Sequence, residues 1–277
     1  MPPSEPASAV FATAQNFDYD RGASGPGRQC AIAVETPIQL SFGGAPFAVM
    51  MATPHDLRDF AVGFALTEGI VERVEDIRGV EIGAVEGGMR VDIALTGERL
   101  SAHLSRVRAM SGRTGCGLCG IEDLAHLPKP RAPLAASAPI APSAIRAALA
   151  GLERAQPLNA ETRATHGAAW SDRSGAVLLT REDVGRHNAL DKLIGALALA
   201  SVDPASGFIV ITSRCSFEMV AKAAAFGTAT LVSVSAPTSL ALERAKECGL
   251  TLVAVARADR ATIFTTAASD AGGGLAA

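Results

Sequence analysis

The second half of the chain alternates short apolar runs with longer segments of helical spacing. Runs such as 208–211 (FIVI) and 231–234 (LVSV) are continuous and rich in β-branched residues, as strands are when helices cover both faces of their sheet. Helices are expected at 143–155, 188–199, 216–225 and 239–248, and strands at 176–181, 207–212, 230–235, 251–256 and 261–265. This order predicts a three-layer α/β/α domain over residues 143–267.

The first half has the signals of a smaller α+β domain over residues 29–127. Two hairpins are expected, one joining 29–40 to 46–51 across Gly43-Gly44 and one joining 80–82 to 89–95 across Gly87-Gly88. A helix should open near Pro54 and run to about Glu68. Residues 101–108 are irregular or helical in this interpretation.

Two segments of biased composition set the predicted boundaries. Residues 128–142 hold five prolines among alanines, which cannot sustain a helix or a central strand, so we expect a proline-rich linker. Residues 1–28 are rich in Ala, Ser, Pro and Gly and lack the basic start and apolar run of a secretory signal. We expect a flexible N-terminal tail on a cytoplasmic protein.

Charge and hydropathy exclude two classes of partner. The net charge of -3 and the pI near 6.0 argue against broad binding to nucleic acid, which needs a basic face. No apolar stretch reaches the roughly 18 to 20 residues of a spanning helix, so no membrane partner is expected. In a reducing cytoplasm the five cysteines should be thiols: Cys30, Cys116, Cys119, Cys215 and Cys248.

A glycine-rich segment carries two of these thiols. Residues 112–120 (GRTGCGLCG) place Cys116 and Cys119 three apart, beside Arg113. A nearby cation and unpaired backbone N–H groups favour the thiolate, which is the form that attacks a persulfide sulfur. Cys116 is the candidate nucleophile, and Cys119 could resolve or share the sulfur by exchange.

A lone C-x-x-C is ambiguous between a zinc half-site, a dithiol redox pair and a sulfur relay. Zinc needs two more Cys or His ligands in recognisable spacing, and the other thiols are scattered. A thioredoxin-type pair follows a strand and opens a helix, whereas this pair is surrounded by glycines. Zinc-dependent deamination needs a His-x-Glu, which is absent. The sulfur relay is favoured, and no metal site is expected.

Three polar junctions follow predicted strands, where α/β folds bind ligands. Residues 181–192 (REDVGRHNALDK) lead into a helix, and residues 213–219 do the same with N–H groups that could hold a phosphate. Residues 257–260 offer two guanidinium groups for bidentate phosphate recognition. Solvated helix starts and an ordinary charged turn are the alternatives. The candidates are Arg181, Asp183, Arg186, His187, Ser213, Arg214, Arg257 and Arg260, with His166 as a secondary one.

Three motifs together carry a family resemblance: RTGCGLCG at 113–120, REDVGRHNALDK at 181–192 and TSRCSFEMVAK at 212–222. Further matches lie at 59–70, 233–241 and 252–265. The chain resembles the formate dehydrogenase accessory sulfurtransferase family, FdhD, over nearly its whole length after the tail. It departs from the family pattern at residues 163–165, where a Gly-Gly usually precedes the histidine, and at Cys215, where a small residue is commoner.

The resemblance implies a homodimer whose large domain has a cytidine-deaminase-like fold, a mixed sheet with helices on both faces, without the deaminase zinc. It implies that a cysteine desulfurase loads sulfur onto the C-x-x-C loop. It also implies binding of the Mo-bis(molybdopterin guanine dinucleotide) cofactor as a client, whose sulfuration makes formate dehydrogenase active.

Residue by residue, Cys116 matches the persulfide cysteine of the family. The segment that matches the family's cofactor-binding stretch is Val255, Ala256, Arg257, Ala258, Asp259 and Arg260. The guanine nucleotide should contact these junction loops. The alternative is a chaperone that holds the molybdenum cofactor without transferring sulfur.

Overall fold

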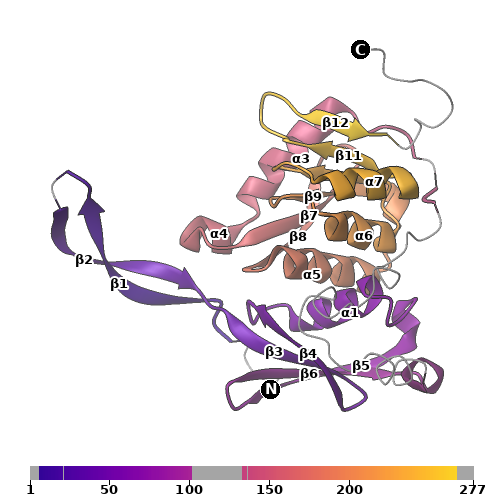
Figure 1. The fold of residues 1–277 in the computed structure, drawn as a ribbon, viewed down its shortest axis with the longest axis horizontal. Coiled ribbons are helices and arrows are strands. Elements are labelled where there is room, and N and C mark those ends of the chain that lie inside the picture. Colours follow the sequence, from indigo (N-terminus) through magenta and orange to yellow (C-terminus); the bar gives the residue numbers. More distant parts are fainter. Residues whose placement is uncertain (1–5, 21, 102–132, 136, 267–277) are drawn as a thin grey trace.

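The structure is a computed structural model that describes residues 6–20, 22–101, 133–135 and 137–266. It contains two sheets with their helices and a separate two-stranded arm (Figure 1). The C-x-x-C segment and residues 128–132 of the expected linker lie outside the described residues. Within the described part, no helix is both long and apolar enough to cross a membrane.

The first unit is a four-stranded sheet with one helix on its inner face. Its strands are β3 (Thr36–Phe42), β4 (Ala45–Ala52), β5 (Ile77–Val85) and β6 (Gly88–Leu95), in the order β4-β3-β6-β5. The helix α1 (Leu57–Thr67) packs Phe60 and Phe64 onto Leu40 and Ile93. A 3-10 turn, η1 (Val74–Asp76), leads into β5. The helix and the second hairpin are confirmed. The first hairpin is confirmed from Thr36 onward, whereas residues 29–33 of its expected first strand belong to a separate strand, β2 (Gly22–Ala33).

The second unit is a mixed six-stranded sheet in the order β12-β11-β10-β9-β7-β8. Its parallel centre consists of β9 (Gly207–Ile211), β10 (Thr230–Ser233) and β11 (Thr251–Ala254). Three antiparallel strands flank it: β7 (His166–Asp172), β8 (Val177–Asp183) and β12 (Thr262–Thr265). The central strands are almost wholly buried, as their continuous apolar sequences predict.

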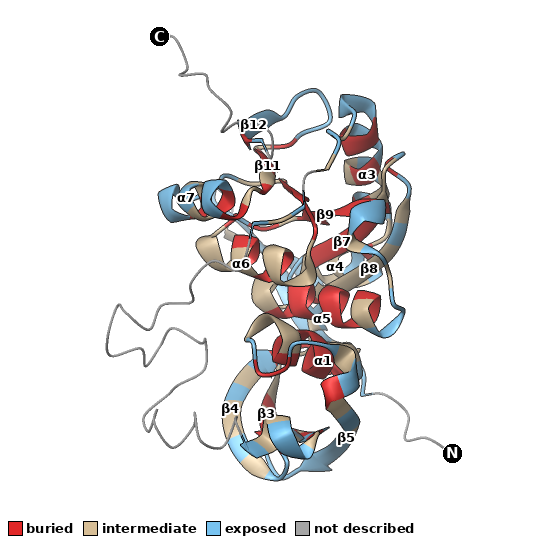
Figure 2. Ribbon diagram, turned by 90° about the vertical axis from the view of Figure 1, so that its right-hand side faces the viewer, coloured by how far each residue is buried: buried red, intermediate tan, exposed pale blue. Residues whose placement is uncertain are grey.

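Helices cover both faces of this sheet (Figure 2). On one face α3 (Pro142–Arg154) packs Ile145 and Leu152 onto Phe208 and Val232. On the other lie α5 (Arg186–Leu199), α6 (Phe217–Phe226) and α7 (Ser239–Cys248), around Trp170. Short elements α4 (Pro157–Thr162) and η3 (Pro204–Ser206) precede β7 and β9. The predicted three-layer arrangement is confirmed; the finer cytidine-deaminase likeness stays a prediction.

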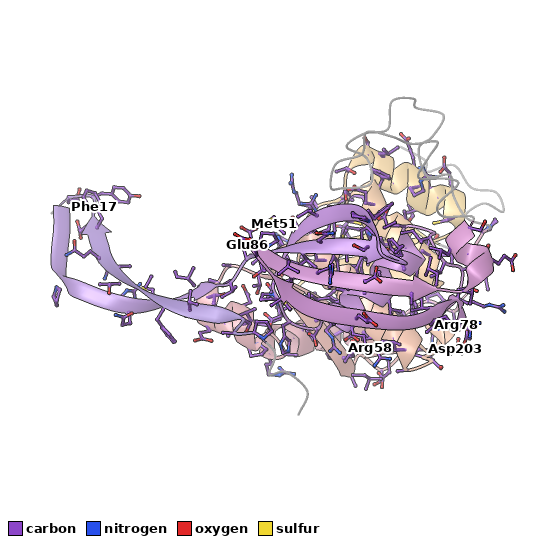
Figure 3. The ribbon with its side chains drawn as sticks, turned by 90° about the horizontal axis from the view of Figure 1, so that it is seen from below. Phe17, Met51, Arg58, Arg78, Glu86 and Asp203 are labelled. Carbon is purple, nitrogen blue, oxygen red and sulfur yellow. The ribbon has the colours of Figure 1, made fainter. Side chains whose placement is uncertain are left out.

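Two glycines let α1 and α5 approach closely, so the two units share a buried interface. A Cβ on Gly63 would lie 1.8 Å from the carbonyl oxygen of Asp191, and one on Gly195 would lie 1.9 Å from that of Asp59. Helix α1 therefore lies between the four-stranded sheet and α5 (Figure 1). The outer face of the four-stranded sheet, toward the viewer in Figure 3, carries no helix of the described chain.

The expected tail over residues 1–28 is wrong where the structure describes it. Strands β1 (Ala9–Asp18) and β2 (Gly22–Ala33) pair antiparallel and form an arm that projects from both units (Figures 1 and 3). Phe17, near its tip, is 66% exposed. Neither face of β1 is buried, so its sequence does not alternate strictly between apolar and polar residues, which is the pattern that would have predicted a strand. The sequence patterns also predicted neither α4 nor β7.

Candidate anion-binding edge of the six-stranded sheet

The sheet topology brings the predicted junctions to one edge. The parallel strands β9, β10 and β11 all end there, and β7, which is antiparallel to β9, begins there. Strand β8 ends there too, since Asp183 is paired with His166. The amide of Thr212 donates to the carbonyl of Gly167 (3.0 Å), which places His166 beside the turn that follows β9. We call this the basic edge: His166, Arg186, His187, Ser213, Arg214 and residues 255–260.

The turn after β11 is tightly fixed. The amides of Val255 and Ala256 donate to the carbonyls of Ser235 (3.1 Å) and Ser233 (3.2 Å), and the Arg257 guanidinium donates to the carbonyls of Val234 and Ala256. Val255 has φ 50°, a conformation that is strained for a β-branched residue and is found mostly where function requires it. The turn therefore holds the exposed residues 257–260 at a defined place.

The turn after β9 is anchored by hydroxyl groups. Ser213 is 4% exposed, its Oγ donates to the carbonyl of Arg214 (3.0 Å), and its own carbonyl accepts from the Oγ of Ser233 (2.8 Å). The Arg214 side chain is exposed. Ser213 therefore shapes this turn, whereas Arg214 is available to a ligand.

Arg186 and His187 occupy the first turn of α5, which contains no acidic residue. This is the positive end of the helix dipole, where cations are unfavourable and anions are stabilised. The Nε of Arg186 is buried and has no hydrogen-bond partner among the described residues. A bound anion would supply the missing hydrogen-bond acceptor. Its negative charge would also compensate the unfavourable position of the Arg186 cation at the positive end of the helix dipole.

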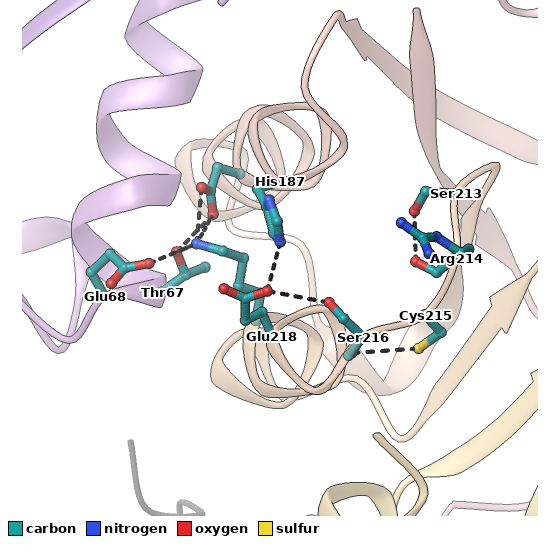
Figure 4. A network of polar contacts seen from close by, with 10 residues as sticks. Thr67, Glu68, His187, Ser213, Arg214, Cys215, Ser216 and Glu218 are labelled. Atoms are coloured by element: carbon teal, nitrogen blue, oxygen red, sulfur yellow. Dashed lines mark hydrogen bonds and ion pairs between the residues drawn. The ribbon is translucent and has the colours of Figure 1, made fainter. Parts of the chain in front are cut away.

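His187 is held in place by a carboxylate on α6. Its Nε2 lies 2.9 Å from Oε2 of Glu218, which also accepts from the Oγ of Ser216 at 3.3 Å (Figure 4). Burial alone would raise the pKa of Glu218, but the hydrogen bonds from His187 and Ser216 and the charge of Lys222 outweigh it and lower that pKa. Glu218 is thus ionised and fixes the imidazole.

A buried lysine connects α6 to the first unit. Lys222 Nζ lies 2.9 Å from a Glu68 carboxylate oxygen and 3.0 Å from both carboxylate oxygens of Asp191, and it also donates to Thr67 (Figure 4). Burial would lower the pKa of Lys222, but the two carboxylates raise it. The ammonium is therefore charged and links α6, α5 and α1.

Two of the residues predicted to bind a ligand instead form hydrogen bonds to the first unit. Arg181 donates to Oδ2 of Asp59 through Nε (2.8 Å) and through Nη2 (2.7 Å). Asp183 is 0% exposed and accepts from the amide of Thr53 (3.0 Å) while pairing with Lys192 (2.7 Å). Both side chains thus join β8 to the first unit, although their backbone lies at the basic edge.

His166 is more central than its sequence context suggested. It is half-buried at the start of β7. Burial and the neighbouring Arg186 charge lower its pKa, against the opposing effect of Asp183. Sequence analysis missed the strand, and with it the pairing that carries this histidine to the edge; the apolar residues that follow His166 were the available signal.

The predicted sulfur-carrying residues Cys116 and Cys119 lie outside the described residues. Of the described thiols, Cys215 and Cys248 are buried and Cys30 lies on the arm. Burial raises the pKa of Cys215 to about 12, so it stays protonated and unreactive. Within the described ranges, no three His, Cys, Asp or Glu side chains gather in a way that could hold a metal.

The chain is similar in sequence to known proteins over most of its length. A sequence model described as the FdhD/NarQ family matches residues 33–269. "Sulfur carrier protein FdhD" of Bordetella petrii is 46% identical over 234 residues, covering 84% of each chain. The protein of the same name from Xanthomonas euvesicatoria is 45% identical over 245 residues, covering 88% of this chain and 87% of its own.

A solved structure shares the fold. The crystal structure of a formate dehydrogenase accessory protein from Desulfotalea psychrophila superposes with a TM-score of 0.71 at 24% identity, covering 94% of this chain and 98% of the other. At 24% identity this similarity shows a shared fold and nothing about function. The family match and the curated relatives cover most of the chain at well above chance similarity, and this protein therefore belongs to the FdhD/NarQ family.

Proposed function

We propose that this protein is a sulfurtransferase that accepts a persulfide sulfur on Cys116 and passes it to the molybdenum cofactor of a formate dehydrogenase. The relatives named as sulfur carriers support the carrier role. The basic edge supports an anionic client, because arginines from three separate junctions lie along one edge of one sheet: Arg186, Arg214, Arg257 and Arg260. That convergence is the observation that carries the proposal.

The sulfur step is a redox-neutral exchange. The Cys116 thiolate attacks the outer sulfur of a persulfide on a cysteine desulfurase; a new S–S bond forms on Cys116, the donor S–S bond breaks, and the donor cysteine leaves as a thiolate. Cys119 is positioned in sequence to receive the sulfur by a second exchange. Neither buried thiol of the described chain fits this role, because the thiolate is the reacting form.

The client in this proposal is the bis(molybdopterin guanine dinucleotide) form of the cofactor. Its pyrophosphates are anions that guanidinium groups and a helix N-terminus recognise. Arg257 and Arg260 lie on the turn after β11, and Arg186 opens α5. Adjacent strands are about 4.8 Å apart, so the strand order β11-β10-β9-β7-β8 separates these turns enough to engage different parts of a large ligand.

Intact-mass analysis tests the sulfur step. The protein is incubated with a cysteine desulfurase and cysteine, and wild type is compared with Cys116→Ala and Cys119→Ala. We expect a gain of about 32 Da, one sulfur, that a reductant removes and that Cys116→Ala abolishes. A gain that persists in Cys116→Ala would assign the sulfur to another thiol.

The second candidate is a chaperone that binds the cofactor while its cysteines serve only structure. The basic edge fits this function equally well, because it needs no thiol. Restoration of formate dehydrogenase activity separates the two: if Cys116→Ala keeps cofactor binding but loses maturation, sulfur transfer is supported, whereas full maturation by Cys116→Ala would establish the chaperone.

We also propose a homodimer, which the arm supports. Val10, Phe11, Phe17 and Tyr19 are between 50% and 96% exposed on it, and an isolated two-stranded ribbon is marginally stable in water. Light scattering should give a mass of two chains, with Phe11→Ser/Phe17→Ser shifting the protein toward one chain. A monomeric wild type would refute this part.

A further inference from the structure

We propose that His166 takes up a proton when a phosphoryl group binds beside Arg186, so that ligand binding at the basic edge is linked to pH. The inference rests on the proposed function in one respect, that the edge binds a phosphate-bearing ligand. It adds a residue and a regulation to that site.

The backbone register fixes where His166 lies. On one side it is paired with Asp183, three residues before Arg186 opens α5. On the other side the bond from Thr212 to Gly167 sets it next to Ser213 and the turn that carries Arg214. His166 thus lies between the two turns whose arginines are available to an anion, and its ring is only half-buried.

The charged groups around the ring decide its protonation. Asp183 on β8 favours the imidazolium, but its carboxylate is already paired with Lys192 and bonded to three other donors. The charges of Arg186 and His187 on α5 disfavour the imidazolium form of His166. Glu218 on α6 is bonded to His187. In the free protein, burial and the Arg186 charge lower the pKa of His166, so the ring is neutral near neutral pH.

An anion between these groups reverses the balance. Its negative charge neutralises Arg186 and adds a direct attraction to the imidazolium, so the pKa of His166 rises in the complex. The proton comes from the buffer. Linkage then gives the sign: affinity is constant above the pKa of the complex, increases as pH falls toward the pKa of the free protein, and levels off below it.

The test uses calorimetry on the full chain with one probe, two guanosines joined through a pyrophosphate, which has no group that titrates near neutral pH. Affinity is measured from about pH 8 to about pH 6 in buffers of different ionisation enthalpy, which report the protons taken up. Wild type should bind several-fold tighter at the lower pH with net proton uptake, approaching the limit of about tenfold that a one-unit rise in pKa sets.

His166→Asn is the decisive variant, and His55→Asn, on an exposed histidine of the first unit, is its control. His166→Asn should bind with a flat pH profile and no proton uptake, whereas His55→Asn should retain both. An unchanged slope in His166→Asn overturns the proposal, as does a wild type that binds without proton uptake. If wild type fails to bind the probe at every pH, the nucleotide site itself is wrong.

A second measurement covers the case in which His166→Asn does not fold. The ring proton resonances of the histidines in wild type are titrated with and without the probe. The midpoint of the His166 resonance should move up by about one unit on binding. A midpoint that stays unchanged in the bound protein contradicts the inference.

Discussion

Replacing Lys192 by Met should lower the free energy of unfolding by about 3 kcal/mol, because it breaks a fully buried ion pair. Lys192 and Asp183 are both 0% exposed, and Nζ lies 2.7 Å from Oδ2. Nζ also donates to the carbonyl of Thr53 (2.9 Å). Removing one partner of a buried pair typically costs about 3 to 5 kcal/mol. The lower end applies, since the amides of Thr53 and Gly185 and the Asn188 side chain still donate to Asp183.

Urea unfolding followed by circular dichroism measures this change, with equal m-values required for the comparison. Lys246→Met is the control: this lysine is exposed in the last turn of α7, and its loss should stay within about 0.5 kcal/mol. The double variant Asp183→Asn/Lys192→Met removes both charges. Its loss of unfolding free energy should be smaller than the sum of the losses in the two single variants. A loss below about 1 kcal/mol for Lys192→Met, or simple additivity, would refute the reasoning.

Arg163, with φ 54°, stands in the left-handed region at the end of α4, so Arg163→Gly should raise the free energy of unfolding by about 1 kcal/mol in the same urea assay. Arg146→Gly, at an exposed position inside α3, should lower it. Glu218 has a depressed pKa in the folded state, so its contribution to stability is fully present above its ordinary pKa of 4.5 and is lost as pH falls from there through the lower folded value. Between these two pKa values wild type should therefore lose stability more steeply than Glu218→Gln, and parallel curves would contradict this. Cys215 and Cys248 should resist alkylation by iodoacetamide at about pH 8 in the native protein and react in urea, as peptide mapping would show; labelling of native Cys215 would mean that its burial is not maintained.

The second unit was largely predictable because its signals are local. Continuous β-branched runs marked β9, β10 and β11, and helix α7 matches its predicted range of 239–248. Strand β7 escaped because its apolar core, Ala168 to Trp170, is short and alanine-rich, a composition with little strand preference. The arm was not predicted, because a strand without a buried face does not need to alternate apolar and polar residues.

The candidate site likewise combines features that local sequence predicts with features that depend on distant contacts. Sequence motifs identified the junction residues, and the structure brings Arg186, Arg214 and Arg257, which follow strand ends, to one edge of the sheet. That this edge binds a ligand stays a prediction. Which polar atoms are already engaged depends on the other unit, more than a hundred residues away in sequence. Arg181 is bonded to Asp59 and Asp183 to Thr53, contacts that no local pattern encodes.

These engaged residues give the basic edge its rigidity. Asp183 accepts from Gly185 (2.7 Å) and Asn188 (3.0 Å), the residues on either side of Arg186 and His187, and it is itself fixed by Lys192 and by the first unit. The start of α5 therefore cannot shift without disturbing the interface between the units. This support preorganises the anion-binding edge that we propose, which reduces the ordering cost of binding. Loss of the Asp183–Lys192 pair should accordingly weaken ligand binding as well as stability, although neither side chain needs to touch the ligand.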